Sequence, residues 1–265
     1  GRRRVKLAVI PSNQHKNQYV GMPKGVTEET VCVQMARAFR YECERQGHEC
    51  QMFWVAGRGE KSTDELTKML AQAKAWRPDL IVSLHSDAGS ARVRDIYPLI
   101  GGSQDRSWAM KVATNMANRV GFAVQGATVR SELLFFSSTV GFRRVLLEVG
   151  NHDYPENAAF NARYADFLGA MAARAVLEAE GKLKSDGPVA FDVPPGQERW
   201  KQVAEKDTRP SRSGYFQGDE QGDFKWDQPL TRWQADTVFS RVKADMDELR
   251  RGMAALVERL EALKA

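Results

Sequence analysis

The stretch Asp79-Leu-Ile-Val-Ser-Leu-His-Ser86 decides the fold class of this chain. It is an almost continuous apolar run of strand length, which is typical of a strand buried on both faces of a parallel sheet. His85 ends the run, and polar loop residues follow it. The run therefore predicts a central strand with an imidazole at its carboxyl end.

Strand-like and helix-like segments alternate on both sides of this run. The first are rich in β-branched and aliphatic residues, and the second have apolar residues at helical spacing. We expect strands at residues 5–10, 49–56, 79–86, 131–136 and 144–149, and helices at residues 27–46, 63–76, 108–120 and 155–180. Thr27 is the expected N-cap of the first helix, and residues 89–102 have the composition of a loop. This alternation predicts an α/β fold, a mainly parallel sheet with helices on both faces.

The composition changes after residue 181. Residues 182–229 are rich in Gly, Pro, Asp and Gln but keep scattered aromatic residues, which indicates a linker that is partly docked. In residues 235–263 apolar residues recur at alternating spacings of four and three, as in a coiled coil. We therefore expect a first domain at 1–181, the linker at 182–229 and a coiled-coil-like helix at 230–265 that joins copies into a homo-oligomer. A single amphipathic helix folded back on the first domain is the alternative.

Charge and hydropathy limit the classes of partner and the cellular location that we expect. The chain has 265 residues and a formal net charge of +5, which favours anionic partners such as nucleic acid, anionic lipid or an acidic cell-wall polymer. Because no nucleic-acid-binding motif is recognisable, we expect no nucleic-acid partner. No apolar run approaches the roughly 18 residues of a membrane span, and the basic start precedes a strand too short for a secretory signal. We expect a protein made in the cytoplasm without a signal peptide and without a membrane span.

The three cysteines form no CxxC pair, so neither a Cys-rich structural zinc site nor a disulfide framework is expected.

Four acid and imidazole side chains stand at strand ends and at one helix start. His15 follows the first strand, Glu28 opens the first helix, His85 ends the central strand and Glu148 lies in the last strand. Residues just past the carboxyl ends of neighbouring strands converge on one crevice of an α/β sheet. Two imidazoles and a carboxylate can hold a catalytic zinc, and a second carboxylate can act as its base. The set predicts a zinc-dependent hydrolase.

Glu148 is the clearest departure from the apolar pattern. It interrupts a strand made for a dry interior, where an ionised carboxylate is costly without a partner. A cation or a metal-bound water would explain it, and an arginine partner is the structural alternative. Glu28 is favoured by the helix dipole whatever its function. Asn151 and His152, just past the last strand, are candidate substrate contacts, although His152 could merely cap the turn.

Three segments resemble the conserved blocks of the zinc-dependent N-acetylmuramoyl-L-alanine amidases, the Amidase_3 family, which includes bacterial cell-wall hydrolases and phage endolysins. The blocks are Thr27-Glu-Glu-Thr-Val-Cys-Val-Gln-Met-Ala36, Ile81-Val-Ser-Leu-His-Ser-Asp-Ala88 and Val145-Leu-Leu-Glu-Val-Gly-Asn151. The resemblance covers about residues 5–180. It implies that zinc is held by His15, Glu28 and His85, and that Glu148 is the catalytic base.

The first block departs from the family pattern. It reads Pro11-Ser-Asn-Gln-His15 where the family has a sequence like Asp-Pro-Gly-His-Gly. Aligning the prolines would place Asn13 at the ligand position. The resemblance therefore leaves open whether His15 or another group is the first metal ligand.

The resemblance implies a peptidoglycan hydrolase with a Zn²⁺ cofactor. Its reaction would be cleavage of the amide between N-acetylmuramic acid and the L-alanine of the stem peptide. An endolysin-like protein of this kind is made in the host cytoplasm and acts at the bacterial cell wall. Two alternatives stay open: another zinc amide hydrolase, such as a peptidase acting on cell-wall peptides, and a non-catalytic multimeric wall-binding protein.

Overall fold

A computed structural model of the chain describes residues 4–55, 62–89, 94–184 and 191. The chain divides into two compact units, residues 1–205 and 206–265. The second unit, with the expected coiled coil at 235–263, lies outside the described residues, as does most of the expected linker at 182–229. The described strands and helices all belong to the first unit.

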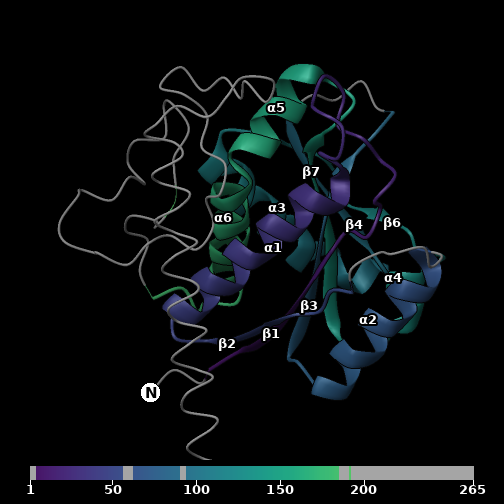
Figure 1. Ribbon diagram of the computed structural model, residues 1–265. Coiled ribbons are helices and arrows are strands. Elements are labelled where there is room, and N and C mark those ends of the chain that lie inside the picture. Colours follow the sequence, from purple (N-terminus) through teal and green to yellow (C-terminus); the bar gives the residue numbers. More distant parts are fainter. Residues whose placement is uncertain (1–3, 56–61, 90–93, 185–190, 192–265) are drawn as a thin grey trace, which may run out of the picture. The chain divides into compact units, whose positions relative to one another are not determined.

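A seven-stranded sheet forms the centre of this unit (Figure 1). Its strands are β1 (Lys6–Pro11), β2 (Glu49–Met52), β3 (Leu80–Asp87), β4 (Asp95–Ile100), β5 (Ala123–Val124), β6 (Thr128–Val129) and β7 (Arg143–Asn151). The order across the sheet is β2-β1-β3-β7-β4-β5, and β6 also pairs with β4. Strands β2, β1, β3 and β7 are parallel, and β4 is antiparallel to β7. The predicted α/β fold with a mainly parallel sheet is confirmed.

Helices cover both faces of the sheet, as predicted. On one face lie α1 (Glu28–Arg45), α3 (Arg106–Val120) and α6 (Ala165–Ala179), and on the other α2 (Ser62–Trp76) and α4 (Leu134–Ser138) (Figure 1). A short 3-10 helix (Ser103–Asp105) precedes α3, and α5 (Pro155–Arg163) follows β7. Strand β3 serves both cores, because Leu80, Val82 and Leu84 pack in the first and Ile81 packs in the second. Burial on both faces explains its continuous apolar run.

The first helix begins where the sequence predicts. The Thr27 side chain accepts a hydrogen bond from the backbone N–H of Thr30, and the Thr30 hydroxyl accepts one from the backbone N–H of Thr27. This reciprocal cap satisfies two amides that the first turn would otherwise leave unpaired. The cap fixes Glu28 in the first turn of α1.

Three predicted elements are wrong. Residues 89–102, expected as a loop, contain β4. Pro98 makes this segment look unlike a strand, because proline is rare inside a sheet. Pro98 falls in the part of β4 that neither β5 nor β6 pairs with. Residues 131–136, expected as a strand, enter the short helix α4, since a short apolar run does not distinguish a strand from a buried helix. Residues 155–180 form two helices that meet at Tyr164, where neither Gly nor Pro marks the break.

His48, in the turn between α1 and β2, is buried. Its Nδ1 accepts a hydrogen bond from the Val5 N–H (3.3 Å), and its Nε2 lies 3.0 Å from the Lys182 carbonyl oxygen. Burial lowers the pKa of this imidazole, although the Lys182 carbonyl acts in the opposite direction. His48 therefore joins the start of β1 to the segment after α6.

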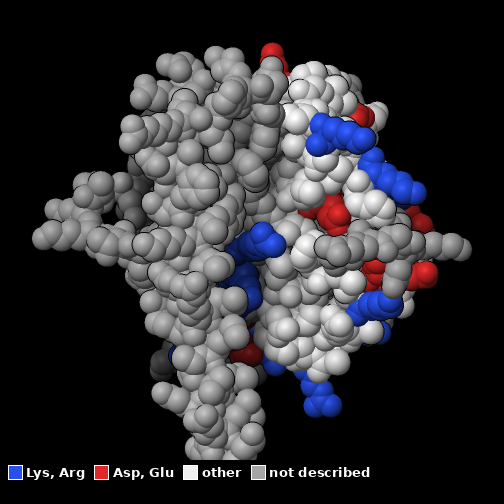
Figure 2. Space-filling model, viewed as in Figure 1, with Lys and Arg blue, Asp and Glu red and all other residues white. Residues whose placement is uncertain are grey.

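The face of the unit seen in Figure 2 is mixed in charge. On this face, basic and acidic side chains are interspersed with uncharged ones rather than gathered over one element. Among the described residues, no helix is long and apolar enough to cross a membrane.

Replacing Gly169 by Ala should destabilise the protein, although Ala is the better helix former by about 1 kcal/mol. A Cβ at Gly169 would lie 1.9 Å from the carbonyl oxygen of Met35, so α1 and α6 would have to move apart. Gly126→Ala is the control, because a Cβ there would meet nothing within 4 Å. We expect a loss of about 1–3 kcal/mol in the free energy of unfolding for Gly169→Ala, as for other overpacked cores. Urea unfolding of both variants checks this, and equal stabilities would contradict it.

Candidate metal centre

Three of the four side chains predicted for the metal site meet at the carboxyl end of the sheet. Glu28, His85 and Glu148 each offer a ligand atom, and these atoms lie within 4.8 Å of one another. His85 and Glu148 are directly paired on the neighbouring parallel strands β3 and β7, so their side chains lie side by side. Glu28 reaches them from the first turn of α1. The predicted convergence of strand ends and helix start is therefore present for these three residues.

Glu28 is a buried carboxylate that several hydrogen-bond donors surround. Its Oε1 lies 3.0 Å from the Nδ1 of His85, and its Oε2 accepts a hydrogen bond of 2.9 Å from the Asn17 amide. The backbone N–H of Ser86 points at Oε1 from 3.5 Å. Burial alone would raise the pKa of Glu28. The hydrogen bond and the charge of His85, helped by Asn17 and Ser12, outweigh burial and lower it.

His85 lies between two acids. Burial lowers the pKa of its imidazole, but the hydrogen bond to Glu28 and the charges of Glu148 and Glu28 raise it overall. A positive charge at this point is therefore favoured by its surroundings.

Glu148 differs from Glu28 in having almost no support. Its Oε2 is shielded from solvent and has no hydrogen-bond partner among the described residues. Burial raises the pKa of this carboxyl to about 8, although the charge of His85 lowers it. The charges of Glu28 and Asp87 raise it further. The charge of Arg130 also lowers the pKa of Glu148, but Arg130 forms its ion pair with Glu132.

This donor set fits a divalent cation. Imidazole nitrogens and carboxylate oxygens are the usual ligands of catalytic zinc. Glu148 belongs to this group, and its Oε2 is a buried acceptor without a hydrogen-bond partner among the described residues. Glu28 and His85 are the residues that could hold the ion, with Glu148 beside them.

The loop after β1 holds the two candidates for a further ligand. His15 is half-buried and lies outside the group of three, and its Nδ1 is shielded from solvent without a hydrogen-bond partner among the described residues. Asn13 is buried, and its amide donates a hydrogen bond to Oε2 of Glu65 (3.4 Å). The role of His15 as a metal ligand stays a prediction.

Asn151 and His152, the expected substrate contacts, make internal contacts here. Both are buried, with exposed fractions of 0% and 3%. The Asn151 side chain accepts a hydrogen bond of 2.8 Å from the backbone N–H of Asp153, and the His152 ring contacts Ser86. In this arrangement neither side chain is open to a substrate.

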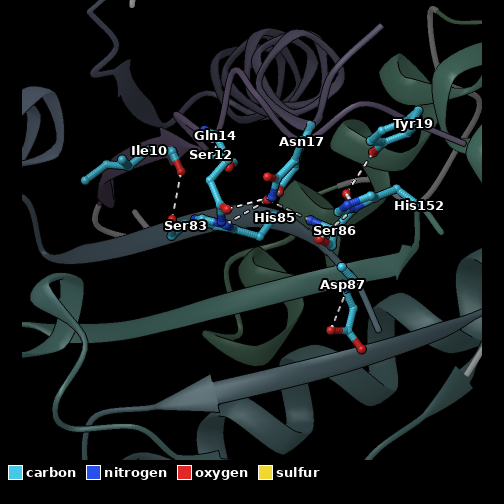
Figure 3. A network of polar contacts seen from close by, with 12 residues as sticks. Ile10, Ser12, Gln14, Asn17, Tyr19, Ser83, His85, Ser86, Asp87 and His152 are labelled. Atoms are coloured by element: carbon cyan, nitrogen blue, oxygen red, sulfur yellow. Dashed lines mark hydrogen bonds and ion pairs between the residues drawn. The ribbon is translucent and has the colours of Figure 1, made fainter. Parts of the chain in front are cut away.

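Sequence reasoning missed the residues that surround the three acid and imidazole groups. Asn17 and Ser12 support Glu28, and Tyr19 and Ser86 form a buried network with His152 (Figure 3). The one available signal was Tyr19, an aromatic residue that follows a run of polar residues in the loop after β1. The other partners are small polar residues, which do not stand out in a loop.

No family model matches the chain, and no curated protein matches it. Solved structures do match. N-acetylmuramoyl-L-alanine amidase AmiC2 of Nostoc punctiforme has a TM-score of 0.54 at 17% identity, over 66% of this chain and 97% of that one. The catalytic domain of the CD27L endolysin targeting Clostridia difficile has a TM-score of 0.53 at 17% identity, over 66% and 98% of the two chains.

The catalytic domain of CwlV, an N-acetylmuramoyl-L-alanine amidase from Bacillus (Paenibacillus) polymyxa var. colistinus, has a TM-score of 0.51 at 17% identity, over 67% and 97%. At such identities the likeness shows a shared fold. The first unit of this chain therefore has the fold of these proteins.

Replacing Glu148 by Gln should stabilise the metal-free protein at pH 8 and change little at pH 4. The pKa of this carboxyl rises from an ordinary 4.5 to about 8 on folding, so between these values the folded state holds a proton that the unfolded state releases. Stability therefore falls as the pH rises through that window. A pKa difference of one unit between the folded and unfolded states corresponds to about 1.4 kcal/mol of stability. Because the Glu148 side chain is half-buried and solvent screens part of its charge, this conversion is an upper bound, and we expect a gain of about 1–3 kcal/mol.

Urea unfolding in a chelator at the two pH values measures this gain. Glu132→Gln, which changes an exposed carboxyl, is the control and should show no such difference. A Glu148→Gln effect of equal size at both pH values would contradict the assigned pKa.

Proposed function

We propose that this chain is a zinc-dependent peptidoglycan amidase. Its reaction would be hydrolysis of the amide between N-acetylmuramic acid and the L-alanine of the stem peptide. The observation that carries the proposal is the group of Glu28, His85 and Glu148 at the carboxyl end of this sheet. The matched structures, named as N-acetylmuramoyl-L-alanine amidases, suggest which amide such a group would cleave.

Glu28 and His85 would hold the zinc, and His15 is proposed as a further ligand. Glu28 suits this role because it is kept ionised by its hydrogen bonds before any cation arrives. In such a site zinc supplies a Lewis acid that polarises an amide carbonyl and activates water near neutral pH. The other contributions come from the protein's own side chains.

Glu148 is the proposed general base. Its Oε2 has no hydrogen-bond partner among the described residues, so no bond to them has to break before it takes a proton from water. The same carboxyl can then return the proton to the departing amine. Its pKa of about 8 describes the protein without a cation, and a positive charge at the site would lower it toward the ionised form that a base needs.

Strand β4 borders the site on the far side of Glu148. Tyr97 is paired with Glu148 across the antiparallel ladder, and its hydroxyl is held by Thr128 at 2.8 Å. Three side chains at this edge are half-buried and remain partly accessible to solvent: Tyr97, His85 and Glu148. A polymeric substrate could therefore approach along this edge of the sheet.

Two wider proposals go with this activity. The protein would act at the bacterial cell wall in the manner of an endolysin, and residues 235–263 would join copies into a homo-oligomer. The endolysin catalytic domain among the matched structures supports the first, and the heptad pattern supports the second.

The purified full-length protein should cleave peptidoglycan and release new L-alanine amino termini while the glycan strands stay intact. Chelation should abolish the activity and zinc should restore it. Glu148→Gln should lower kcat by about 10²- to 10⁴-fold, the usual contribution of a general acid–base residue, and should still bind zinc. Glu132→Gln is the control and should keep full activity. New termini elsewhere in the stem peptide would indicate a peptidase, and activity that survives chelation would overturn the zinc mechanism.

A separate experiment tests whether His15 or Asn13 is the first metal ligand. We expect His15→Ala to weaken zinc binding more than about 100-fold, the upper range for residues that only support a ligand. Asn13→Ala should leave it near the wild-type value. Zinc dissociation constants from competition with a chromophoric chelator decide the matter. The reverse order of the two variants would assign the position to Asn13.

A further inference from the structure

The regular pairing of β3 with β7 ends at the metal centre. His85 pairs with Glu148, and the next pair is Asp87 with Asn151. Strand β3 advances by two residues (85 to 87) while β7 advances by three (148 to 151), so β7 carries a one-residue bulge. A bulge interrupts the ladder of hydrogen bonds. The strand pairing therefore does not by itself fix the backbone beyond His85.

Helix α5 holds the β7 side of the bulge. The Asn161 amide donates to the carbonyl oxygen of Val149 (2.7 Å), and the Asn157 amide donates to that of Asn151 (2.6 Å). Gly150 between them has a φ of +64°, and a Cβ there would lie 2.6 Å from the Asn157 amide nitrogen. The bulge is thus a fixed feature with its own carbonyl partners.

A different set of contacts holds the β3 side (Figure 3). The Tyr19 hydroxyl donates a hydrogen bond to the Ser86 Oγ (2.9 Å). The His152 Nδ1 lies 2.8 Å from that Oγ and 3.1 Å from the Ser86 carbonyl oxygen. The Tyr19 ring stacks on the imidazole, with 5.2 Å between centroids and 7° between planes. All three residues are buried, so this network is shielded from water.

His152 also joins three segments through its backbone. Its N–H donates to the Asp87 carbonyl at the end of β3, and its carbonyl accepts from the Val20 N–H in the loop before α1. Ser86, which the imidazole holds, directly follows His85 in β3. The Ser86 N–H also points at Oε1 of Glu28 from 3.5 Å. Ser86, which His152 holds, is therefore next to His85 in the chain and next to Glu28 in space. These are the two residues proposed to hold the metal.

We propose that His152 is a positioning residue of the metal centre, which acts through Ser86 to hold His85 and Glu28 in place where the bulge interrupts the strand pairing. The inference rests on the proposed zinc site. It gives His152 a role that its burial permits, whereas contact with a substrate would require it to be exposed. Residues that orient metal ligands in this way typically contribute 10- to 100-fold to metal affinity.

The test compares two buried histidines in the full-length protein. His152→Ala removes the imidazole beside Ser86. His48→Ala removes one that also contacts two backbone groups, Val5 and Lys182, neither of which belongs to the metal centre. For each variant we would measure the zinc dissociation constant by chelator competition and the stability of the metal-free protein by urea unfolding. His152→Asn serves as the rescue, because its amide can occupy the position of Nδ1.

We expect His152→Ala to weaken zinc binding by about 10- to 100-fold and His152→Asn to recover most of the loss. His48→Ala should lower the stability but bind zinc as the wild type does. Ser86→Ala, which removes only one hydroxyl, should weaken zinc binding in the same direction, and it replaces His152→Ala if that variant does not fold.

Two results would overturn the positioning role while the proposed function stands. One is wild-type zinc affinity in folded His152→Ala or Ser86→Ala. The other is a loss of affinity that follows the loss of stability equally in the His152 and His48 variants. Failure of the wild-type protein to bind zinc would instead overturn the proposed function, and the positioning role with it.

Discussion

Ligand atoms of two carboxylates and one imidazole lie within 4.8 Å of one another at the carboxyl end of the sheet, and the arrangement around them depends on that constraint. Like charges at this range repel, and burial strengthens the repulsion because water no longer screens it. The protein does not treat the two acids alike. Glu28 receives hydrogen bonds that lower its pKa, whereas Glu148 receives none at Oε2 from the described residues and its pKa rises to about 8. One acid is stabilised as an anion, and the other is left to gain or lose a proton.

This difference follows from where the two acids lie in the fold. Glu28 stands in the first turn of a capped helix, where the dipole favours an anion, and the loop after β1 brings Asn17 to it. Glu148 stands within a strand, with His85 on one side and Tyr97 on the other. No described residue donates a hydrogen bond to its Oε2. The same residue type therefore suits a ligand in one position and a proton carrier in the other.

The fold was predictable where local pattern and tertiary role coincide. The run around β3 is apolar because both of its faces are buried, and Thr27 is a cap because its own side chain closes the turn. Prediction failed where a distant contact decides. Pro98 lies in the part of β4 that neither β5 nor β6 pairs with, and the sequence of β4 does not show where those strands pair. Nothing near Tyr164 in the sequence marks the end of α5.

The residues of the site likewise differ in how far the sequence alone predicts them. Glu148 was visible in the sequence because an acid in a dry strand is an anomaly that local pattern exposes. The network of Tyr19, Ser86 and His152 was not, because Ser86 and His152 lie 66 positions apart and meet only when β3 and β7 pair. Gly150 marks an irregularity in β7, but nothing in either strand alone indicates which residue of β3 His152 will meet. A sequence can therefore reveal which groups do the chemistry before it reveals what holds them, since chemistry requires particular residue types and support requires only that a donor be near.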